Sequence, residues 1–285
     1  MRIHRIVVFL SVIALTVSCG TKKRHAGPVS RVVTLTPSAT ELVAVLGAAD
    51  MLVGVDRYSV HPPRVKKLPK VGDFMHPSFE AIITLKPHLV VLDKVQNKLV
   101  PKLERAGIRT LVLKMHTIDD VHTGIRELGK AIGRQSKAAE LTAKLAADTR
   151  AIGKRVALYK GGRPRVLMLL GREVGTLKTM VAAGPGSFMD ELIKKLGATN
   201  AMSGSPLRYP KISVEQIMRS QPDVILDAVR QHQVAAAKAD WAKLDRVPAV
   251  TNKRIYPLTD QIFMSPGPRV SEALTRLAKL LYPDL

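Results

Sequence analysis

The sequence has few aromatic side chains, one cysteine and a shortage of acidic residues. Of its 285 residues, 4% are aromatic, and the cysteine is Cys19. A single cysteine excludes an internal disulfide framework, and the low aromatic content leaves few rings for a ligand pocket. Lys and Arg number 45 against 23 Asp and Glu, which gives a net charge of +22. With 46% hydrophobic residues, the chain can bury the core of one large domain or of two ordinary ones.

The excess positive charge is scattered along the chain. Basic pairs occur at 66–67, 194–195 and 253–254, without aromatic interleaving or zinc-finger spacing. This pattern does not indicate a nucleic-acid partner. A generally basic proteome accounts for the charge most simply, and anionic lipid headgroups or an anionic small ligand are the partners that it would otherwise suit.

The N-terminus has the pattern of an export signal. Two arginines precede an apolar run from Ile6 to Val17, which is too short to cross a bilayer of ~30 Å but suits a signal peptide over residues 1–18. The residues Leu15-Thr16-Val17-Ser18-Cys19 resemble a bacterial lipobox, with Thr16 where Leu is usual. The resemblance implies that Cys19 is the lipid attachment site and that residues 19–28 form a tether. We therefore expect a chain anchored in the cell envelope, facing the periplasm or the cell exterior. A secreted protein with a free thiol is the alternative.

The two halves of the sequence repeat each other. The matching segments are 31–35 with 165–169, 41–48 with 191–198, and 78–92 with 213–226. Because three matches occur in the same order, they predict two lobes built on one plan.

Each half alternates short apolar strands with helices. In the first half we expect strands at 31–36, 51–55, 89–92 and 110–113, with helices at 38–47, 78–86 and 99–106. In the second half we expect strands at 166–170, 224–226 and 254–257, with helices at 187–196, 213–220 and 270–281. Residues 38–41 match a capping box, which predicts that Ser38 caps the first helix. Uniformly apolar strands separated by helices are typical of a mainly parallel sheet covered by helices.

The segment between the halves predicts one long helix. Residues 136–160 carry apolar side chains at helical spacings and no proline, and at 1.5 Å per residue such a helix is roughly 37 Å long. A rigid connection of this length predicts lobes that close only slightly. The expected fold is α/β, with two Rossmann-like lobes of mainly parallel sheet, at 29–133 and 161–285, joined by a backbone helix at 134–160.

Motifs from both halves carry a family resemblance. They are Arg31–Leu42 (RVVTLTPSATEL), Gly54–Ser59 (GVDRYS) with Pro62-Pro63, Val71–Phe74 (VGDF), Glu80–Ile82 with Lys86-Pro87, and Glu215-Gln216 with Gln221–Ile225. Together with the leader and the long helix, they resemble the helical-backbone class, class III, of substrate-binding lipoproteins of ABC importers. The resemblance extends over residues 29–283 and is closest to the cobalamin-binding members, through Tyr58 and Pro62-Pro63. Proteins of this class carry cobalamin, haem, ferric siderophores or, in a sister group, bare metal ions.

The resemblance implies a transport role. It predicts a monomer that captures cobalamin or a related corrinoid between its lobes and delivers it to an ABC permease dimer with its ATPase subunits. Glu80 and Glu215 correspond to the glutamates that pair with arginines on the two permease subunits. Each also lies in the first turn of an expected helix, where the helix dipole alone would favour a carboxylate.

The ligand is expected between the lobes, where the loops after the strands converge. The predicted ligand-binding residues are Pro37, Ser38, Tyr58, Phe74, Tyr209 and Asp260. Three features depart from the family pattern: Phe74 and Tyr209 stand where tryptophans occur in well-known members, and no arginine follows soon after Asp260. Arg269, which opens the last helix, is expected to be structural.

Other ligands and other classes of protein stay open at this point. Tyr58 or Tyr209 could be an axial haem ligand, and cationic groups could hold an anionic ferric siderophore. A bare-metal site has weaker support, because His76 and His116 lack a ligand spacing and the second half offers only Asp260. The sequence has no P-loop, G-x-S-x-G elbow or G-x-G-x-x-G after a strand, so we do not expect an enzyme or a catalytic cofactor. A tethered interaction protein without a small ligand is the remaining alternative.

Overall fold

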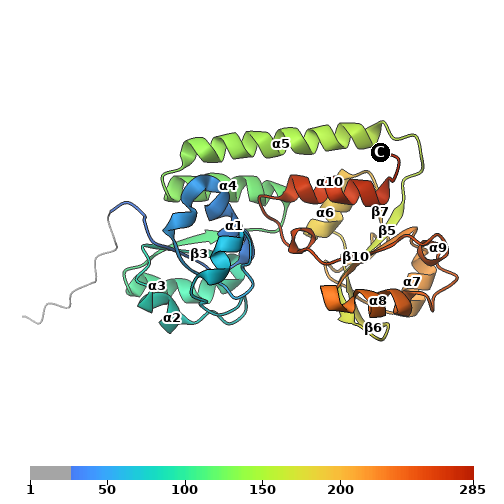
Figure 1. The fold of residues 1–285 in the computed structure, drawn as a ribbon, viewed down its shortest axis with the longest axis horizontal. Coiled ribbons are helices and arrows are strands. Elements are labelled where there is room, and N and C mark those ends of the chain that lie inside the picture. Colours follow the sequence, from blue (N-terminus) through green and yellow to red (C-terminus); the bar gives the residue numbers. More distant parts are fainter. Residues whose placement is uncertain (1–26) are drawn as a thin grey trace, which may run out of the picture.

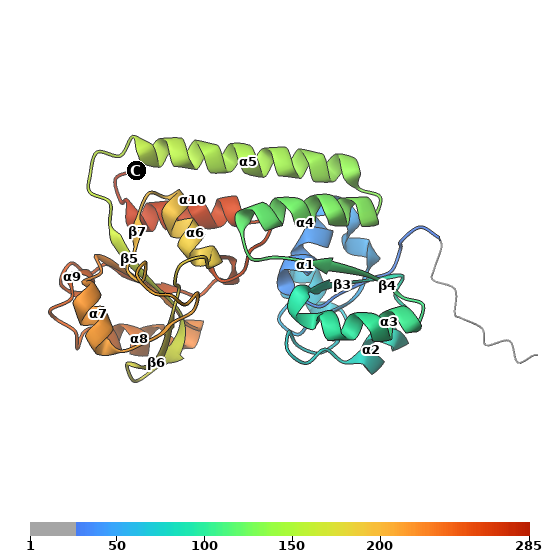
Figure 2. The same ribbon diagram turned by 180° about the vertical axis from the view of Figure 1, so that it is seen from behind.

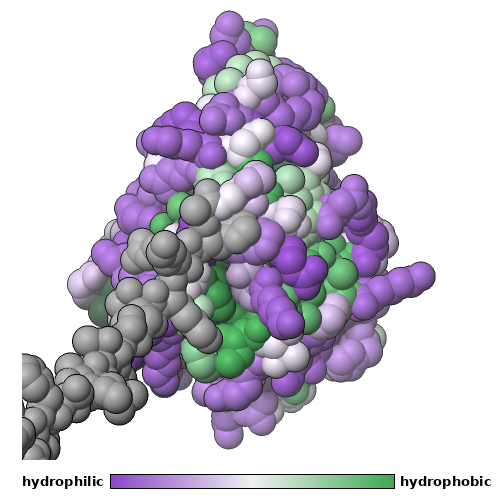
Figure 3. Space-filling model, turned by 90° about the vertical axis from the view of Figure 1, so that its left-hand side faces the viewer, coloured by the Kyte–Doolittle hydropathy of each residue, from purple (hydrophilic) through white to green (hydrophobic). Residues whose placement is uncertain are grey.

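The computed structural model describes residues 27–285. Two α/β lobes lie side by side beneath one long helix, α5 (Gln135–Ala157), as Figure 1 shows. The predicted signal peptide and Cys19 lie outside the described residues. Within the described part of the chain, no helix is both long and apolar enough to cross a bilayer. Seen from the end formed by the N-terminal lobe, hydrophobic side chains are exposed in patches bordered by hydrophilic ones (Figure 3).

The N-terminal lobe contains a four-stranded parallel sheet. Its strands, in the order β2-β1-β3-β4, are Leu52–Val55, Val32–Thr34, Leu89–Asp93 and Arg109–Leu113. The α-helices of this lobe are α1 (Pro37–Val43), α2 (Phe79–Thr84), α3 (Val100–Arg105) and α4 (Ile118–Ala131). Successive strand residues point to opposite faces, so Val32 and Val33 lie in different buried clusters. Because both faces of the sheet are covered, the inner strands β1 and β3 are buried along their whole length and mostly apolar, as the sequence predicts. The edge strand β4 begins with Arg109-Thr110 and is mostly half-buried.

The C-terminal lobe combines a parallel sheet with an antiparallel extension. Its parallel strands are β7 (Thr199–Asn200), β5 (Arg165–Glu173), β9 (Val224–Ala228) and β10 (Ile255–Leu258). The first residues of β5 pair with β7, and its later residues pair antiparallel with β6 (Lys178–Ala182). β6 in turn pairs antiparallel with β8 (Lys211–Ile212). The α-helices are α6 (Phe188–Lys195), α7 (Val214–Ser220), α8 (Val234–Trp241), α9 (Pro248–Thr251) and α10 (Val270–Leu281). The elements expected from the sequence did not include β6, β7 and β8, or the helices α4, α8 and α9.

The backbone repeats as the sequence does. The order β7-β5-β9-β10 reproduces β2-β1-β3-β4, and all of these neighbours are parallel. The amide of His88 donates to the carbonyl of Arg31 at 2.8 Å, and the amide of Asp223 donates to that of Arg165 at the same distance. The residues before the two matching prolines, Lys86 and Gln221, both have a left-handed backbone, with φ of 46° and 43°. The lobes therefore share the same strand order and the same backbone conformation at equivalent turns.

The first helix begins differently from the prediction. Its N-cap is Thr36, whose side chain accepts from the amide of Ala39 at 3.2 Å, and Pro37 occupies the first turn. Proline suits this place because its fixed φ is helical and the amide it lacks would have no partner in the helix. The predicted capping box at Ser38 is wrong, since Ser38 and Glu41 instead face the other lobe. After α1 the chain continues through a π-helical turn, Ala44–Ala48, in which Gly47 has a φ of 71°.

The long helix shares a core with both lobes. α5 has 23 residues, which makes it about 35 Å long at 1.5 Å per residue. Beneath it, α4 from the first lobe and α10 from the second lie end to end (Figures 1 and 2). Buried residues of α5, such as Leu145 and Ile152, belong to one hydrophobic cluster that contains Val32 of the first sheet and Val166 of the second. A continuous core of this kind resists movement of the lobes against each other, because such movement would expose apolar surface.

Candidate functional site

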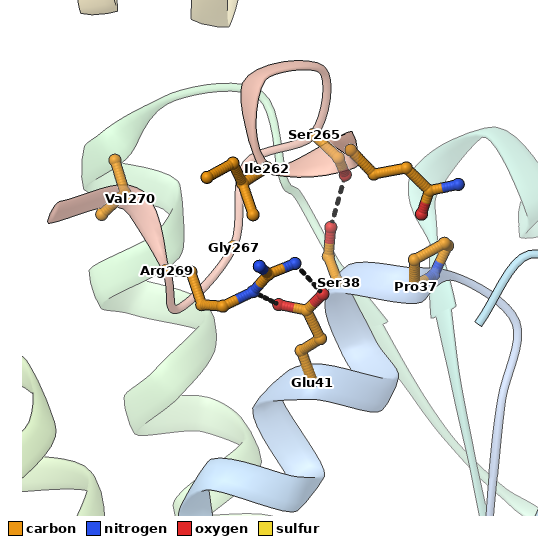
Figure 4. Close-up of a pocket in the computed structure, with 9 residues that line it drawn as sticks. Pro37, Ser38, Glu41, Ile262, Ser265, Gly267, Arg269 and Val270 are labelled. Carbon is orange, nitrogen blue, oxygen red and sulfur yellow. Dashed lines mark hydrogen bonds and ion pairs between the residues drawn. The ribbon is translucent and has the colours of Figure 1, made fainter. Parts of the chain in front are cut away.

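The two lobes touch where the predicted residues Pro37 and Ser38 lie. The Ser38 hydroxyl is 2.7 Å from that of Ser265, which belongs to the loop after β10 (Figure 4). Around this contact, a void of about 20 Å³ is lined by residues of α1 and of the 261–270 segment. Such a void has room for little more than a water molecule. Pro37 and Ser38 therefore form the contact between the lobes at this point.

A larger hollow lies at the carboxyl ends of the second sheet. Its volume is about 580 Å³, within the range of small-molecule sites. The lining comes from the ends of β5, β9 and β10 and the residues that follow, and it includes Arg172, Arg230, Gln233, Thr259, Asp260 and Gln261. The carboxyl edge of a parallel sheet is where ligands bind in open α/β folds. The structure thus places the predicted residue Asp260 in the wall of a pocket of suitable size.

Asp260 is already bound by the protein. Its Oδ1 accepts from the amide of Ile262 at 3.1 Å, and its Oδ2 accepts from Arg276 at 2.7 Å. Burial opposes the charge of Asp260, but these hydrogen bonds outweigh burial and hold the pKa of its carboxyl below the usual 3.8. The arginine that the sequence lacks just after Asp260 is supplied from helix α10. Asp260 is therefore a charged residue in the lining of the larger hollow, and its carboxylate is held in place by hydrogen bonds.

The first lobe has a smaller hollow that contains Phe74. It measures about 230 Å³ and is lined by Phe74, Met75, Pro77, Val95, Gln96, Lys98, Leu99 and Lys102. The side-chain amide of Gln96 donates to the Phe74 carbonyl at 2.9 Å and so ties this loop to the segment after β3. Met75 is 70% exposed. The surface is apolar, with two lysines at its margin.

The two predicted tyrosines line neither the void at the lobe contact nor the two hollows. Tyr58 is 51% exposed and Tyr209 is 46% exposed. The amide of Tyr58 donates to the carboxylate of Asp56 at 2.9 Å, which fixes the turn after β2. Partial burial raises the pKa of the Tyr209 phenol. The six predicted ligand residues are therefore spread over the lobe contact, the two hollows and two exposed positions.

Glu80 and Glu215 occupy matching positions. Ser78 caps α2 and Ser213 caps α7, and each glutamate is the second residue of its helix, with its side chain exposed. A hydrogen bond from Ser213 lowers the pKa of Glu215. Both helices lie on the side of the lobes away from α5 (Figures 1 and 2). One exposed carboxylate thus lies in the first turn of each of these two helices.

A buried ionic network that the sequence did not predict lies beside the larger hollow. The fully buried side chain of Arg172 contacts Asp227 at 3.1 Å and Asp240 at 2.7 Å. Trp241 donates to Asp227 at 2.7 Å, and the Arg172 guanidinium lies 5.2 Å from the centre of the Trp241 ring. Burial raises the pKa of Asp227, whose Oδ1 is buried without a hydrogen-bond partner. An arginine at the end of an apolar strand is the one sequence signal of this network, and its partners are distant in the chain.

The described residues contain no cluster suited to a metal ion. Within 27–285, no group of three His, Cys, Asp or Glu side chains gathers as a ligand set. His76 lies 3.2 Å from Asp73 and is exposed, while the amide of His116 donates to Asp120 at 3.0 Å. The two histidines considered at the sequence level are thus part of local turns.

Comparison with known proteins defines the class of this chain. Residues 32–262 match the family described as periplasmic binding protein, and the chain belongs to this family. It is 28% identical over 260 residues to an uncharacterized ABC transporter substrate-binding lipoprotein, YvrC, of Bacillus subtilis, covering 89% of this chain and 80% of that one. It is 26% identical over 253 residues to the vitamin B12-binding protein of Pectobacterium carotovorum, covering 88% of each chain.

The fold has a close counterpart among solved structures. The periplasmic haem-binding protein RhuT from Roseiflexus sp. RS-1, in its apo form, superposes with a TM-score of 0.80 at 26% identity, covering 90% of this chain and 99% of that one. The predicted two-lobed α/β fold and the resemblance to class III binding proteins are confirmed. The chain is a substrate-binding protein of an ABC importer, and its relatives are transport components of the cell envelope.

Proposed function

We propose that this protein captures cobalamin or a related corrinoid between its lobes and delivers it to an ABC permease dimer with its ATPase subunits. The observation that carries the delivery role is the equivalence of Glu80 and Glu215, each exposed at the second position of a serine-capped helix. A permease dimer with two-fold symmetry requires a partner with matching charges on two lobes, and the internal repeat supplies one. The vitamin B12-binding relative supports the choice of ligand.

The chemistry of the hollows suits a corrinoid. A corrinoid presents a large ring with apolar faces and a periphery of amide groups. The larger hollow offers Gln233, Thr259 and Gln261 as uncharged hydrogen-bonding partners for amides. The smaller hollow offers Phe74 and apolar neighbours for a ring face. We assign Tyr58, Tyr209 and Asp260 to the same site, as residues that contact the ring or its amides. Pro37 and Ser38 are assigned to it as further ligand-binding residues.

The proposal includes the N-terminus and the lobe boundaries. Residues 1–18 are a signal peptide, Cys19 is the lipid attachment site, and residues 19–28 tether the lobes at 29–133 and 161–285, with the backbone helix at 134–160, to the membrane. The similarity to a lipoprotein of Bacillus subtilis supports this assignment. The protein acts as a monomer that faces the periplasm or the cell exterior.

A ferric ligand is the second candidate. Lys98 and Lys102 border one hollow and Arg230 the other, which suits an anionic siderophore or the propionates of haem. The exposed phenols of Tyr58 and Tyr209 are groups that can ligate ferric iron. The similarity to a haem-binding structure favours haem within this alternative.

Calorimetric titration distinguishes these ligands. Cobalamin, haemin and a ferric siderophore are titrated separately into the protein lacking its leader, and visible spectra are recorded. Trp241 is fully buried against Arg172, so its fluorescence is a poor direct reporter and calorimetry is preferred. We expect cobalamin to bind, and Tyr58→Ala and Tyr209→Ala to weaken it. Leu158→Ala, at an exposed position at the end of α5, is the control. Binding of haemin without any corrinoid would contradict the first choice of ligand.

Charge reversal tests the docking surface. Glu80→Lys combined with Glu215→Lys should abolish ligand uptake by cells while ligand affinity stays unchanged, because both side chains lie outside the hollows. The matched control is Glu127→Lys with Glu140→Lys, which reverses two exposed carboxylates on α4 and α5. Normal uptake by the first double variant would exclude docking through these glutamates.

A further inference from the structure

Two helices begin at the junction between the lobes. Helices α4 and α10 lie end to end beneath α5 (Figures 1 and 2). The first residue of α4, Ile118, and the N-cap of α10, Arg269, both contact the opposite lobe. The N-terminus of a helix carries a partial positive charge, so two such ends brought together repel each other unless anions lie between them.

A glutamate of the first lobe meets α10. Both carboxylate oxygens of Glu41, on α1, accept from the guanidinium of Arg269, at 2.9 Å and 2.8 Å (Figure 4). The two side chains are 12% and 20% exposed. A paired, largely buried contact between arginine and carboxylate is among the stronger and more directional polar interactions in proteins. The hydrogen bond between Ser38 and Ser265 lies in the same contact.

A glutamate of the second lobe meets α4. The side chain of Glu191, on α6, accepts from the backbone amide of Ile118 at 2.8 Å. This amide is one of the donors that the first turn of a helix leaves without a partner in the helix. The carboxylate therefore satisfies the amide and lies at the positive end of the helix.

The two glutamates are equivalent in the internal repeat. Each is followed directly by Leu, and each precedes a Leu-Gly-Ala turn, at 46–48 in the first lobe and 196–198 in the second. The glycines of these turns have a φ of 71° and 65°. Each lobe therefore extends the same carboxylate, from the same helix, to the start of a helix in the other lobe.

We propose that Glu41 and Glu191 form a matched pair of inter-lobe ties that sets the spacing of the two lobes. The ties act at the lobe junction, whereas the shared core along α5 holds the lobes from above. With the ties in place the two hollows, one in each lobe, are a defined distance apart, and so are the helices α2 and α7. The role is one of positioning, and it concerns the protein without ligand or permease.

Distance measurement between the lobes tests this proposal. The chain starting at residue 19 and carrying Cys19→Ser has no native cysteine. Spin labels are attached at Thr84→Cys on α2 and Arg219→Cys on α7, which are exposed and equivalent in the repeat. We expect a narrow distance distribution in the parent protein. In Glu41→Gln with Glu191→Gln, we expect the distribution to broaden and shift to longer distances.

Two further variants separate positioning from general destabilisation. Glu127→Gln with Glu140→Gln removes two exposed carboxylates from α4 and α5 and should leave the distribution unchanged. Ser38→Cys with Ser265→Cys, oxidised to a disulfide before labelling, should restore the narrow distribution in the Glu41→Gln background. An unchanged distribution in the folded double glutamine variant would overturn the proposal. If that variant does not fold, unchanged distributions in both single variants would do the same.

Discussion

The two lobes share one plan and differ in what surrounds it. Both contain four parallel strands in the same order, and both carry a serine-capped helix with a glutamate at its second position. Among the residues that the structure describes, only the C-terminal lobe extends its sheet with antiparallel strands, β6 and β8, and it has the larger of the two hollows. The shared features are the ones to which we assign the symmetric tasks of docking and lobe spacing. The differences lie where an asymmetric ligand would be bound.

The lobes also differ in the polar groups that they bury. In the N-terminal lobe, hydroxyl groups of Thr34, Thr40 and Ser59 form a chain that ends at Asp56. In the C-terminal lobe, Arg172 holds two buried carboxylates. Removing one member of an ionic network leaves an uncompensated charge, whereas removing a hydroxyl leaves a neutral group unpaired. The same kind of substitution should therefore cost more in the second lobe.

The largest effect is expected from Arg172→Met. Because Asp227 and Asp240 would lose their buried counter-charge, we expect the free energy of unfolding to fall by about 3–5 kcal/mol. Urea denaturation followed by circular dichroism measures the change. Arg246→Met, at an exposed position of the same lobe, is the control and should have little effect. A loss no greater than that of the control would show that the network does not stabilise the lobe.

A smaller loss is expected from Thr40→Val in the first lobe. The Thr40 hydroxyl lies 2.6 Å from that of Thr34 and 2.7 Å from that of Ser59, so its removal leaves both with fewer partners. We expect a loss of about 1–3 kcal/mol by the same measurement. Thr123→Val, on an exposed face of α4, provides the control. A loss exceeding that of Arg172→Met would contradict the contrast between the lobes.

One buried carboxylate in each lobe should respond to pH with opposite sign. Burial raises the pKa of Asp56 above 3.8, so its contribution to stability is present below pH 3.8 and is lost as the pH rises through the folded-state value. For Asp190, burial opposes the charge, but hydrogen bonds from Lys194, Asn200 and Gly186 outweigh it and lower the pKa. Its contribution is therefore present above pH 3.8 and is lost as the pH falls through the folded-state value.

Unfolding free energies of Asp56→Asn and Asp190→Asn, measured on both sides of pH 3.8, test these signs. Relative to wild type, the penalty of Asp190→Asn should shrink on acidification, and that of Asp56→Asn should grow. If the two penalties changed in the same direction with pH, the pKa values of Asp56 and Asp190 would not be shifted in opposite directions.

The smallest effects should be equal in the two lobes. Ser78 accepts from the amide of Ala81 at 3.2 Å, and Ser213 accepts from that of Gln216 at 3.4 Å. Ser78→Ala and Ser213→Ala should each lower the free energy of unfolding by about 1 kcal/mol, as expected for the loss of a helix N-cap. Ser203→Ala, exposed and outside the helices, is the control. A clear difference between the two losses would show that α2 and α7 are not energetically equivalent.

Much of the fold could be predicted because its signals are local or repeated. Strands β3 and β4 and helices α2, α3, α7 and α10 lie where apolar runs, capping serines and prolines place them. Helix α4 was missed although its apolar residues, such as Val121, Ile125 and Leu128, are buried at helical spacing. The antiparallel strands β6 and β8 were missed because they have no counterpart in the first half. The start of α1 was predicted wrongly because two capping patterns overlap there, and proline decided between them.

The candidate site depended more on contacts that are distant in the chain. No arginine follows soon after Asp260 in the sequence, and the one that contacts it, Arg276, lies in the following helix. Arg172 carried no motif, since its partners Asp227 and Asp240 follow in separate elements. Glu41 was interpreted as part of a cap, whereas its partner lies in the other lobe.

The sequence by itself determined the doubled α/β plan, the long helix and the matching positions of Glu80 and Glu215. These follow from periodicity, capping and internal repetition, which act over a few neighbouring residues or can be compared along the chain. Only the tertiary structure decided which side chains meet across the lobes, which hollows the strand ends form and which charges are buried. Those properties depend on how distant elements pack, because burial and pairing are set by three-dimensional neighbours.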